Sequence, residues 1–168
     1  MLTGIVVLAL LGAAPQALAA PPPGCPTPEY HQLDFWIGDW DAYEPEIPGA
    51  AQARAHIDPI LGHCAIHEVY EQVDGLIGDS VLSFDAVRKV WQQTWITNRG
   101  SLMVIQGAFK DGTLTLEGEM HGKDGKAWLQ RISWKAEDKG VHEWAVRSGD
   151  GGKTWEPAFD VHFLKHRR

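Results

Sequence analysis

The chain has few cysteines and no internal run of basic residues, and both shortages limit what it can be. Its formal charge is −7, and its one basic cluster, Lys165-His166-Arg167-Arg168, is a terminal tail. Because phosphate binding needs clustered Lys and Arg, we expect no nucleic-acid partner. Long apolar segments with a 3.6-residue period are also missing, which predicts little helix.

Catalytic motifs are equally scarce. The sequence contains no Gly-x-Ser-x-Gly elbow and no phosphate-binding glycine loop. His63 and His67 would stand about 13 Å apart along one strand, too far for a shared zinc ion. We therefore expect no catalytic residues and no metal site, and the sequence favours a binding protein over an enzyme.

Long apolar runs are absent except at the N-terminus. Residues 5–14 are apolar, and Ala17-Leu18-Ala19 has the small-x-small pattern that a signal peptidase recognises. This predicts a cleaved signal peptide over residues 1–20 and export to the periplasm or the outside of the cell. This apolar run is too short to span a bilayer as a stable helix, and no other stretch is long and apolar enough to anchor the protein in a membrane. Residues 21–168 suit a single domain.

The two cysteines are Cys25 and Cys64. An even number in an exported chain favours a disulfide, and its loop of 39 residues would be worth roughly 4 kcal/mol in the chain-entropy model. The alternative is a redox or metal-binding thiol pair, although no Cys-x-x-Cys spacing occurs.

Short strand-like segments fill the rest of the chain. Turn residues such as Asp111-Gly112 and Asp124-Gly125 separate them and favour tight hairpins. The predicted strands lie near residues 39–44, 51–57, 63–73, 80–86, 90–97, 101–109, 113–120, 127–135, 142–147 and 155–164, after a short helical turn at 29–33. About ten strands joined by hairpins predict an all-β, antiparallel up-and-down barrel.

Aromatic residues gather at the start of the first predicted strand. Phe35 and Trp36 precede Gly38, where the backbone must turn, and Trp40 follows two residues later. Small closed barrels often begin with such an aromatic group before a Gly-x-Trp triplet. We therefore expect these three side chains to plug one end of the barrel.

The stretch from Ser148 to Trp155 fits the Asp-box pattern Ser-x-Asp-x-Gly-x-x-Trp at every specified position. The Asp carboxylate can accept turn amides, and the Gly supplies positive φ. Sialidase-type propellers carry several copies of this box in much longer chains, whereas this chain has one. The pattern therefore favours a well-formed last hairpin over a propeller enzyme.

Several runs together resemble the secreted proteins of the DUF1579-like group. They are Cys25–Asp41, Gly62–Glu68, Trp91–Trp95, Arg131–Trp134 and Asp150–Trp155, which are spread over nearly all of the mature chain. The resemblance implies a calycin-like barrel, related in architecture to lipocalins and fatty-acid-binding proteins and distantly similar to nitrobindins. It implies no particular activity.

Strand alternation sorts candidate interior residues by face. If the chosen faces point inward, five side chains converge: Glu68, Gln93, Trp95, Gln106 and Arg131. Apolar walls with a few placed polar groups are typical of a ligand pocket. This predicts non-catalytic binding of a small apolar or amphipathic molecule, with Arg131 holding a ligand carboxylate or pairing with Glu68 to brace the barrel.

Two alternatives stay open. Nitrobindins hold haem through a histidine late in the barrel, and His162 has a comparable place in this chain, so a haem-dependent or other enzymatic barrel would need His162 to face inward. Apart from haem in this alternative, we expect no cofactor. The second alternative is a filled barrel whose outer surface binds a protein partner.

Overall fold

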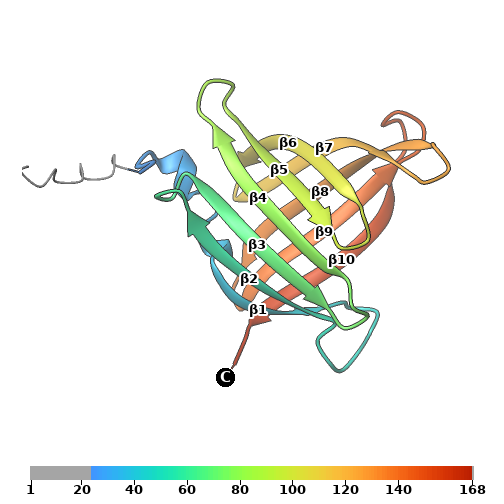
Figure 1. Cartoon of the computed structure of the whole chain (residues 1–168), viewed down its shortest axis with the longest axis horizontal. Coiled ribbons are helices and arrows are strands. Elements are labelled where there is room, and N and C mark those ends of the chain that lie inside the picture. The colour runs from blue at the N-terminus through green and yellow to red at the C-terminus, as the bar shows by residue number, and fades with distance from the viewer. Residues whose placement is uncertain (1–23, 168) are drawn as a thin grey trace, which may run out of the picture.

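The computed structural model describes residues 24–167 and forms a closed barrel of ten antiparallel strands (Figure 1). The strands are β1 (Gly38–Tyr43), β2 (Ala53–Ile60), β3 (Ala65–Gln72), β4 (Ile77–Asp85), β5 (Val90–Thr97), β6 (Leu102–Lys110), β7 (Thr113–His121), β8 (Ala127–Glu137), β9 (Gly140–Ser148) and β10 (Glu156–Lys165). Each strand pairs with its neighbours in the chain, and β10 pairs with β1 to close the barrel. This confirms the predicted all-β up-and-down barrel. The predicted signal peptide lies outside the described residues.

Tight turns explain why the strands follow one another in order. Asp111 and Gly112 alone connect β6 to β7, and both have positive φ, at 51° and 78°. A two-residue loop of this kind matches the twist of the strands that it joins. Asp accepts the conformation at modest cost and Gly at none, as the sequence predicts.

Alternating burial along each strand separates the interior from the outer surface. In β2, Ala53, Ala55 and Ile57 are buried, while Arg54 and His56 between them are exposed. Inward-facing side chains of all ten strands form one core cluster. At about 25 cal/mol for each Å² of apolar surface removed from water, this burial is the main stabilising contribution.

An aromatic plug closes one end of this interior. Trp36 is only 1% exposed, stacks on Trp40 with 5.6 Å between ring centroids, and meets Phe163 edge-on at 4.5 Å. Trp40 Nε1 donates a hydrogen bond of 2.8 Å to the Trp36 carbonyl. Phe35 is half-buried and lies 6.4 Å from Phe109. The three predicted aromatic residues therefore lie together at the entry to β1.

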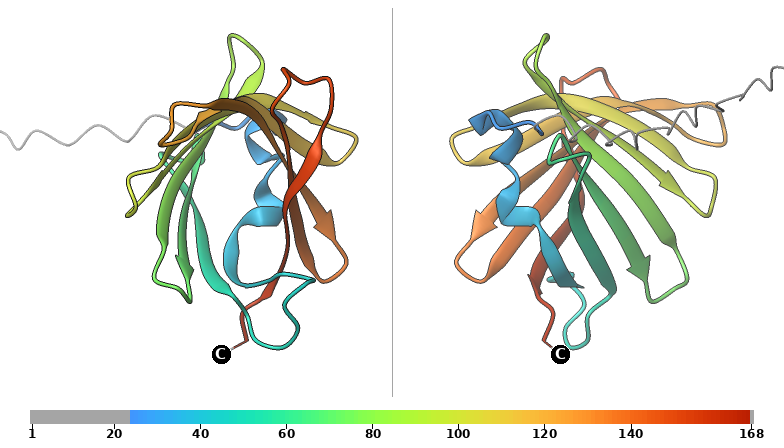
Figure 2. Two further views of the ribbon diagram at one scale, coloured as in Figure 1. Left: turned by 90° about the vertical axis from the view of Figure 1, so that its right-hand side faces the viewer. Right: turned by 60° about the vertical axis from the view of Figure 1, so that its left-hand side comes forward.

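Two short 3-10 turns carry the plug, η1 (Pro28–His31) and η2 (Asp34–Trp36), where the sequence predicts one turn at residues 29–33. Figure 2 shows them in blue, leading into β1. Tyr30 packs edge-on against Phe84 of β4, and Gln32 Oε1 accepts a hydrogen bond of 2.9 Å from Trp91 Nε1 of β5. These contacts tie the entry segment to the strand ends at the plugged end.

A disulfide joins Cys25 to Cys64, as the sequence predicts, and links the segment before η1 to the loop between β2 and β3. The Cys25 backbone N–H also donates to the Gly62 carbonyl at 3.3 Å. The bridge therefore holds the entry segment against the plugged end of the barrel. In the described part of the chain, no helix has both the length and the apolarity needed to cross a membrane.

Replacing both Cys25 and Cys64 by Ser is expected to lower the free energy of unfolding by roughly 2–4 kcal/mol, because the unfolded chain regains the entropy of an open loop. Urea unfolding followed by tryptophan fluorescence measures the change. Dithiothreitol should lower the midpoint of the wild-type protein and leave that of the double variant where it is. Equal midpoints for the wild type and the double variant would contradict the prediction.

Candidate functional site

The barrel encloses a cavity of about 390 Å³ at the end opposite the plug. Its apolar wall consists of Leu76, Trp95, Met103, Met120, Ile132, Phe159, Val161 and Phe163, together with the ring of Tyr70. Its polar lining consists of Glu44, Glu68, Gln72, Gln93, Thr97, Ser101, Gln130 and Glu143. Gln72 and Thr97 end β3 and β5 at the open end of the barrel, and Ser101 directly precedes β6 there. Glu68, Gln93 and Glu143 lie about midway along their strands, closer to the plug. The cavity is thus a cup with a polar rim, an aromatic wall and a polar floor.

A glycine makes room for the aromatic wall. A Cβ at Gly78 of β4 would stand 2.0 Å from the Trp95 ring, so only Gly lets this indole lie across the neighbouring strand. Tyr70 meets Trp95 edge-on, with 5.9 Å between the ring centroids. These two rings form one side of the cup above Glu68.

Three buried polar side chains form a hydrogen-bonded row on the floor. Ser80 Oγ donates to Glu68 Oε2 at 2.9 Å, and Gln93 Nε2 donates to Ser80 Oγ at 3.3 Å. The row runs across β3, β4 and β5. Ser80 lies opposite Glu68 of β3 on one side and opposite Trp95 of β5 on the other. Glu68, Ser80 and Gln93 are 5%, 1% and 3% exposed. Among the buried side-chain nitrogen and oxygen atoms of the described residues, only Gln93 Oε1 and, in the plug, Trp36 Nε1 have no hydrogen-bond partner.

A second carboxyl, Glu143 of β9, faces the same cavity. Burial raises the pKa of Glu143 well above its usual value, the negative charge of Glu68 raises it further, and a hydrogen bond from Trp134 opposes both effects. Burial likewise raises the pKa of Glu68 to about 7, against the lowering effect of the hydrogen bond from Ser80. Burial disfavours the charged form of an acid, and two acids in one cavity disfavour each other's ionisation. Near neutral pH the pair therefore holds a proton that ordinary carboxyls would have lost.

No Lys, Arg or His occurs among the described residues that line the cavity. Elsewhere in the chain, carboxylates do lie beside histidines. All eight histidines have a carboxylate within 4.0 Å: His31 and His63 with Asp34, His56 with Asp39, His67 with Asp79, His121 with Glu119, His142 with Asp160, His162 with Glu137, and His166 with Asp41. Each of these histidines lies outside the cavity lining.

The cavity contains three of the five predicted ligand-binding candidates, Glu68, Gln93 and Trp95. The expectation that Gln106 and Arg131 also point inward is wrong. Gln106 is exposed and accepts a hydrogen bond of 2.8 Å from Arg88 Nη1.

Arg131 lies on the outer side of β8, where it pairs with Glu117 at 2.7 Å and stacks over the Trp155 ring at 4.0 Å. It can therefore neither anchor a ligand in the interior nor pair with Glu68. The outward place of Gln106 and Arg131 follows from register, because their strand neighbours Ile105 and Ile132 fill the core. In β6 both faces carry apolar residues, so alternation alone could not choose between them.

His162 also lies on the outer face. Its ring is stacked parallel to that of His142 with 4.4 Å between centroids, and its Nδ1 lies 3.1 Å from a Glu137 oxygen. Its neighbours in β10, Val161 and Phe163, face the cavity instead. The haem-dependent alternative requires His162 to face inward, and His162 does not.

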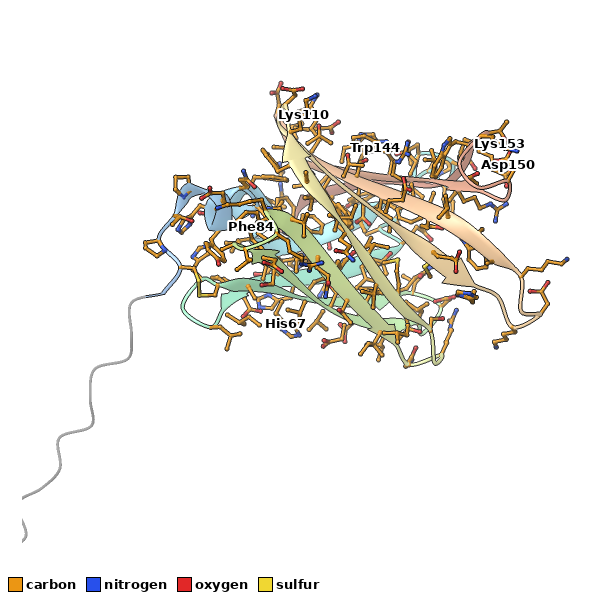
Figure 3. The ribbon with its side chains drawn as sticks, turned by 90° about the horizontal axis from the view of Figure 1, so that it is seen from above. His67, Phe84, Lys110, Trp144, Asp150 and Lys153 are labelled. Carbon is orange, nitrogen blue, oxygen red and sulfur yellow. A yellow bond between two sulfur atoms is a disulfide. The ribbon has the colours of Figure 1, made fainter. Side chains whose placement is uncertain are left out.

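Two outer clusters bring together groups of the kind that ligate metals. They are His31, Asp34 and His63 beside the disulfide, and His142, Asp160 and His162 on β9 and β10, each with ligand atoms within 4.8 Å of one another. Sequence reasoning considered His63 with His67, whereas the fold places His63 with Asp34 at 2.7 Å and His67 with Asp79 at 3.0 Å. Figure 3 labels His67 on the outer side of the barrel.

Sequence reasoning missed Glu143 and Phe159 as lining residues. The signal for Glu143 was present, since it stands between Val141 and Ala145 at the two-residue period of a buried strand face. A carboxyl on an otherwise apolar, buried strand face does not serve hydrophobic packing, so it is a candidate functional residue.

The Asp-box hairpin joins β9 to β10 at the open end of the barrel. Asp150 Oδ1 accepts hydrogen bonds from the backbone N–H groups of Lys153 and Thr154, both at 3.0 Å, and Trp155 Nε1 donates to the Gly152 carbonyl. The backbone N–H of Thr154, the hydroxyls of Ser148 and Thr154 and the backbone N–H of Lys153 all donate to the Asp150 carboxylate and hold its pKa at about 2. Figure 3 shows Asp150 and Lys153 far from Phe84, which marks the plugged end. The predicted last hairpin is confirmed.

Replacing Glu68 by Gln is expected to stabilise the protein more at about pH 8 than at about pH 5. The pKa of Glu68 rises from 4.5 in the unfolded chain to about 7 in the folded protein, so stability falls as pH rises between these values. Gln cannot ionise, and its side-chain oxygen can still accept the hydrogen bond from Ser80. The variant should therefore avoid up to about 3 kcal/mol of the stability that the wild type loses as pH rises. Urea unfolding at both pH values measures the difference.

Glu71→Gln is the matched control, because Glu71 is exposed on β3, the strand that also carries Glu68. Its effect on stability should be the same at both pH values. A Glu68→Gln effect that is also independent of pH would show that this carboxyl titrates normally.

No protein-family model matches the chain, and no curated protein matches it either. The resemblance to the DUF1579-like group therefore stays a prediction, and the function has to be argued from the cavity.

Proposed function

We propose that the protein is an exported, non-catalytic binding protein that holds a small amphipathic molecule inside its barrel. The observation that carries this proposal is the cup of about 390 Å³, with an aromatic wall and a few polar groups on its floor. Ligand pockets commonly have roughly 300–1,000 Å³, mostly apolar walls and few polar groups that fix orientation.

The plug supports the proposal because it makes the cup blind. Trp36 and Phe163 pack edge-on in the interior on the plug side of the cup, which Phe163 also lines, so a ligand would enter between the loops at the open end. Such a molecule would place its polar group against Glu68 and Glu143 and its apolar body against Tyr70 and Trp95. The binding energy would come mainly from apolar surface removed from water.

Export is part of the same proposal. The disulfide between Cys25 and Cys64 fits an oxidising compartment, in which such bridges persist. The N-terminal pattern of the sequence agrees with it. We keep the DUF1579-like resemblance, with its calycin-like architecture, within this proposal.

The cavity weighs against the filled-barrel alternative, since a filled barrel would leave no cup. Some apolar side chains do lie exposed on the outer face of β4 to β6, namely Val81, Ile96, Leu102 and Val104. Exposed apolar residues are common on soluble proteins and need no partner to explain them.

Replacing Val161 by Phe is expected to weaken ligand binding at least about tenfold, because the larger ring would occupy space inside the cup. The probe is the neutral dye N-phenyl-1-naphthylamine, whose fluorescence rises in apolar surroundings. Titration of the native protein gives its dissociation constant.

Two control variants accompany this test. Val104→Phe makes the same substitution on the outer face of β6, where Val104 is 44% exposed, and Arg131→Ala removes the outward-facing arginine. Both should bind the dye like the wild type. A wild-type protein that does not bind the dye, or a Val161→Phe variant that binds it equally well, would refute the proposed function.

A further inference from the structure

We infer that the molecule held in the cup carries a positively charged amine, which lies on the floor between Glu68 and Glu143. This inference rests on the proposed function and specifies the chemical class of its ligand as an amphipathic amine. It follows from what the floor offers a ligand and from what the floor lacks.

The floor is rich in acceptors and poor in donors. Glu68 has one oxygen bonded to Ser80, and the donor of Gln93 is used by the same Ser80 hydroxyl. Gln93 Oε1 is left without a partner, although Gln93 is only 3% exposed and lines the cavity. A buried acceptor without a donor costs free energy, so this oxygen is a place for an N–H group from outside the protein. An ammonium group brings up to three such donors.

The floor also lacks a positive charge. Two carboxyls from opposite walls, Glu68 on β3 and Glu143 on β9, face one cavity in which none of the described lining residues is Lys, Arg or His. A buried carboxyl either keeps its proton or pairs with a cation, because an unpaired charge loses its hydration without compensation, and a cation between these two would let them ionise. The histidines of this chain are all matched with carboxylates elsewhere, so the floor is where a cation is missing.

The wall above the floor suits a cation with an apolar body. The rings of Tyr70 and Trp95 lie edge-on beside each other next to Glu68, and Phe159 lines the same cavity. Aromatic faces attract ammonium groups and bury alkyl chains. A carboxylate ligand would meet two acids instead of a base, which excludes it from the best place in the cup.

Proton release should accompany binding. Burial holds the pKa of Glu68 at about 7 and raises that of Glu143, and the other groups that act on them are Ser80 and Trp134 within the barrel and His67 and Asp79 outside it. Tyr70 and Glu44 are the other titratable groups that line the cavity. A cation between the two carboxyls favours their charged forms and so lowers both pKa values. Affinity for an amine should therefore rise with pH around neutrality, while affinity for an alcohol should not.

The test compares three probes with the same alkyl chain: octylamine, octanol and octanoate. Calorimetric titration of the native protein near pH 7 should give octylamine an affinity at least about tenfold above that of octanol, and octanoate the lowest affinity. Octylamine should bind about tenfold more tightly at pH 8 than at pH 6. Its binding enthalpy should differ between phosphate and Tris buffers, because a released proton is taken up by the buffer.

Variants locate the effect. Glu68→Gln combined with Glu143→Gln should reduce the ratio of octylamine to octanol affinity to about one and remove the buffer dependence, whereas Glu119→Gln on the outer face should keep both. Thermal unfolding checks that each variant folds. If the double variant does not fold, Glu143→Gln alone should lower the ratio.

The outcomes separate this inference from the function on which it rests. Octanol bound as tightly as octylamine, or octanoate bound more tightly, would overturn the amine inference and leave a binding cup. A ratio unchanged in the double variant would overturn it as well, because the preference would then arise elsewhere. No binding of any of the three probes would overturn both proposals.

Discussion

Closure of one barrel end by an aromatic plug is the constraint on which the rest of the structure depends. Trp36, Trp40 and Phe163 fill the interior at the entry to β1, and the disulfide and the Gln32–Trp91 hydrogen bond hold the entry segment there. Since the plugged half is packed with apolar side chains, that half supplies most of the burial that keeps ten hairpin-linked strands closed. The other half is thereby free to keep a cavity and polar groups that a uniformly packed core would exclude.

The fold could be predicted from sequence because its signals are local. Turn pairs such as Asp111-Gly112 and the alternation of apolar residues fixed the number and order of strands, and all ten lie within about three residues of their expected places. The disulfide could be predicted from an even number of cysteines, only two, together with the predicted export of the chain. The plug followed from three aromatic residues beside Gly38.

The candidate site is less predictable, because tertiary structure decides which face of each strand points into the barrel. Moving a strand by one residue exchanges its inner and outer faces, and β6 presents apolar side chains on both sides. This ambiguity in β6 accounts for the wrong prediction at Gln106. In β8, choosing the face that carries Leu129 and Ser133 accounts for the wrong prediction at Arg131, which is paired outside with Glu117 and stacks on Trp155. The sequence does place Glu143 on a buried strand face, but its pairing with Glu68 cannot be predicted from it, because the two residues are far apart in the chain and reach one cavity only in the closed barrel.

The distribution of charge between the two surfaces of the barrel gives the site its character. Outside, carboxylates are matched with histidines and arginines in water, where each such pair contributes at most about 1 kcal/mol. Inside, two carboxyls share a low-dielectric cavity without a cation, and they keep protons that they would lose in water. A chain selected for stability alone would gain by replacing them with apolar residues of similar size, as holds for many buried ionic groups. Their presence on the floor of a blind cup is therefore best explained by what the cup receives.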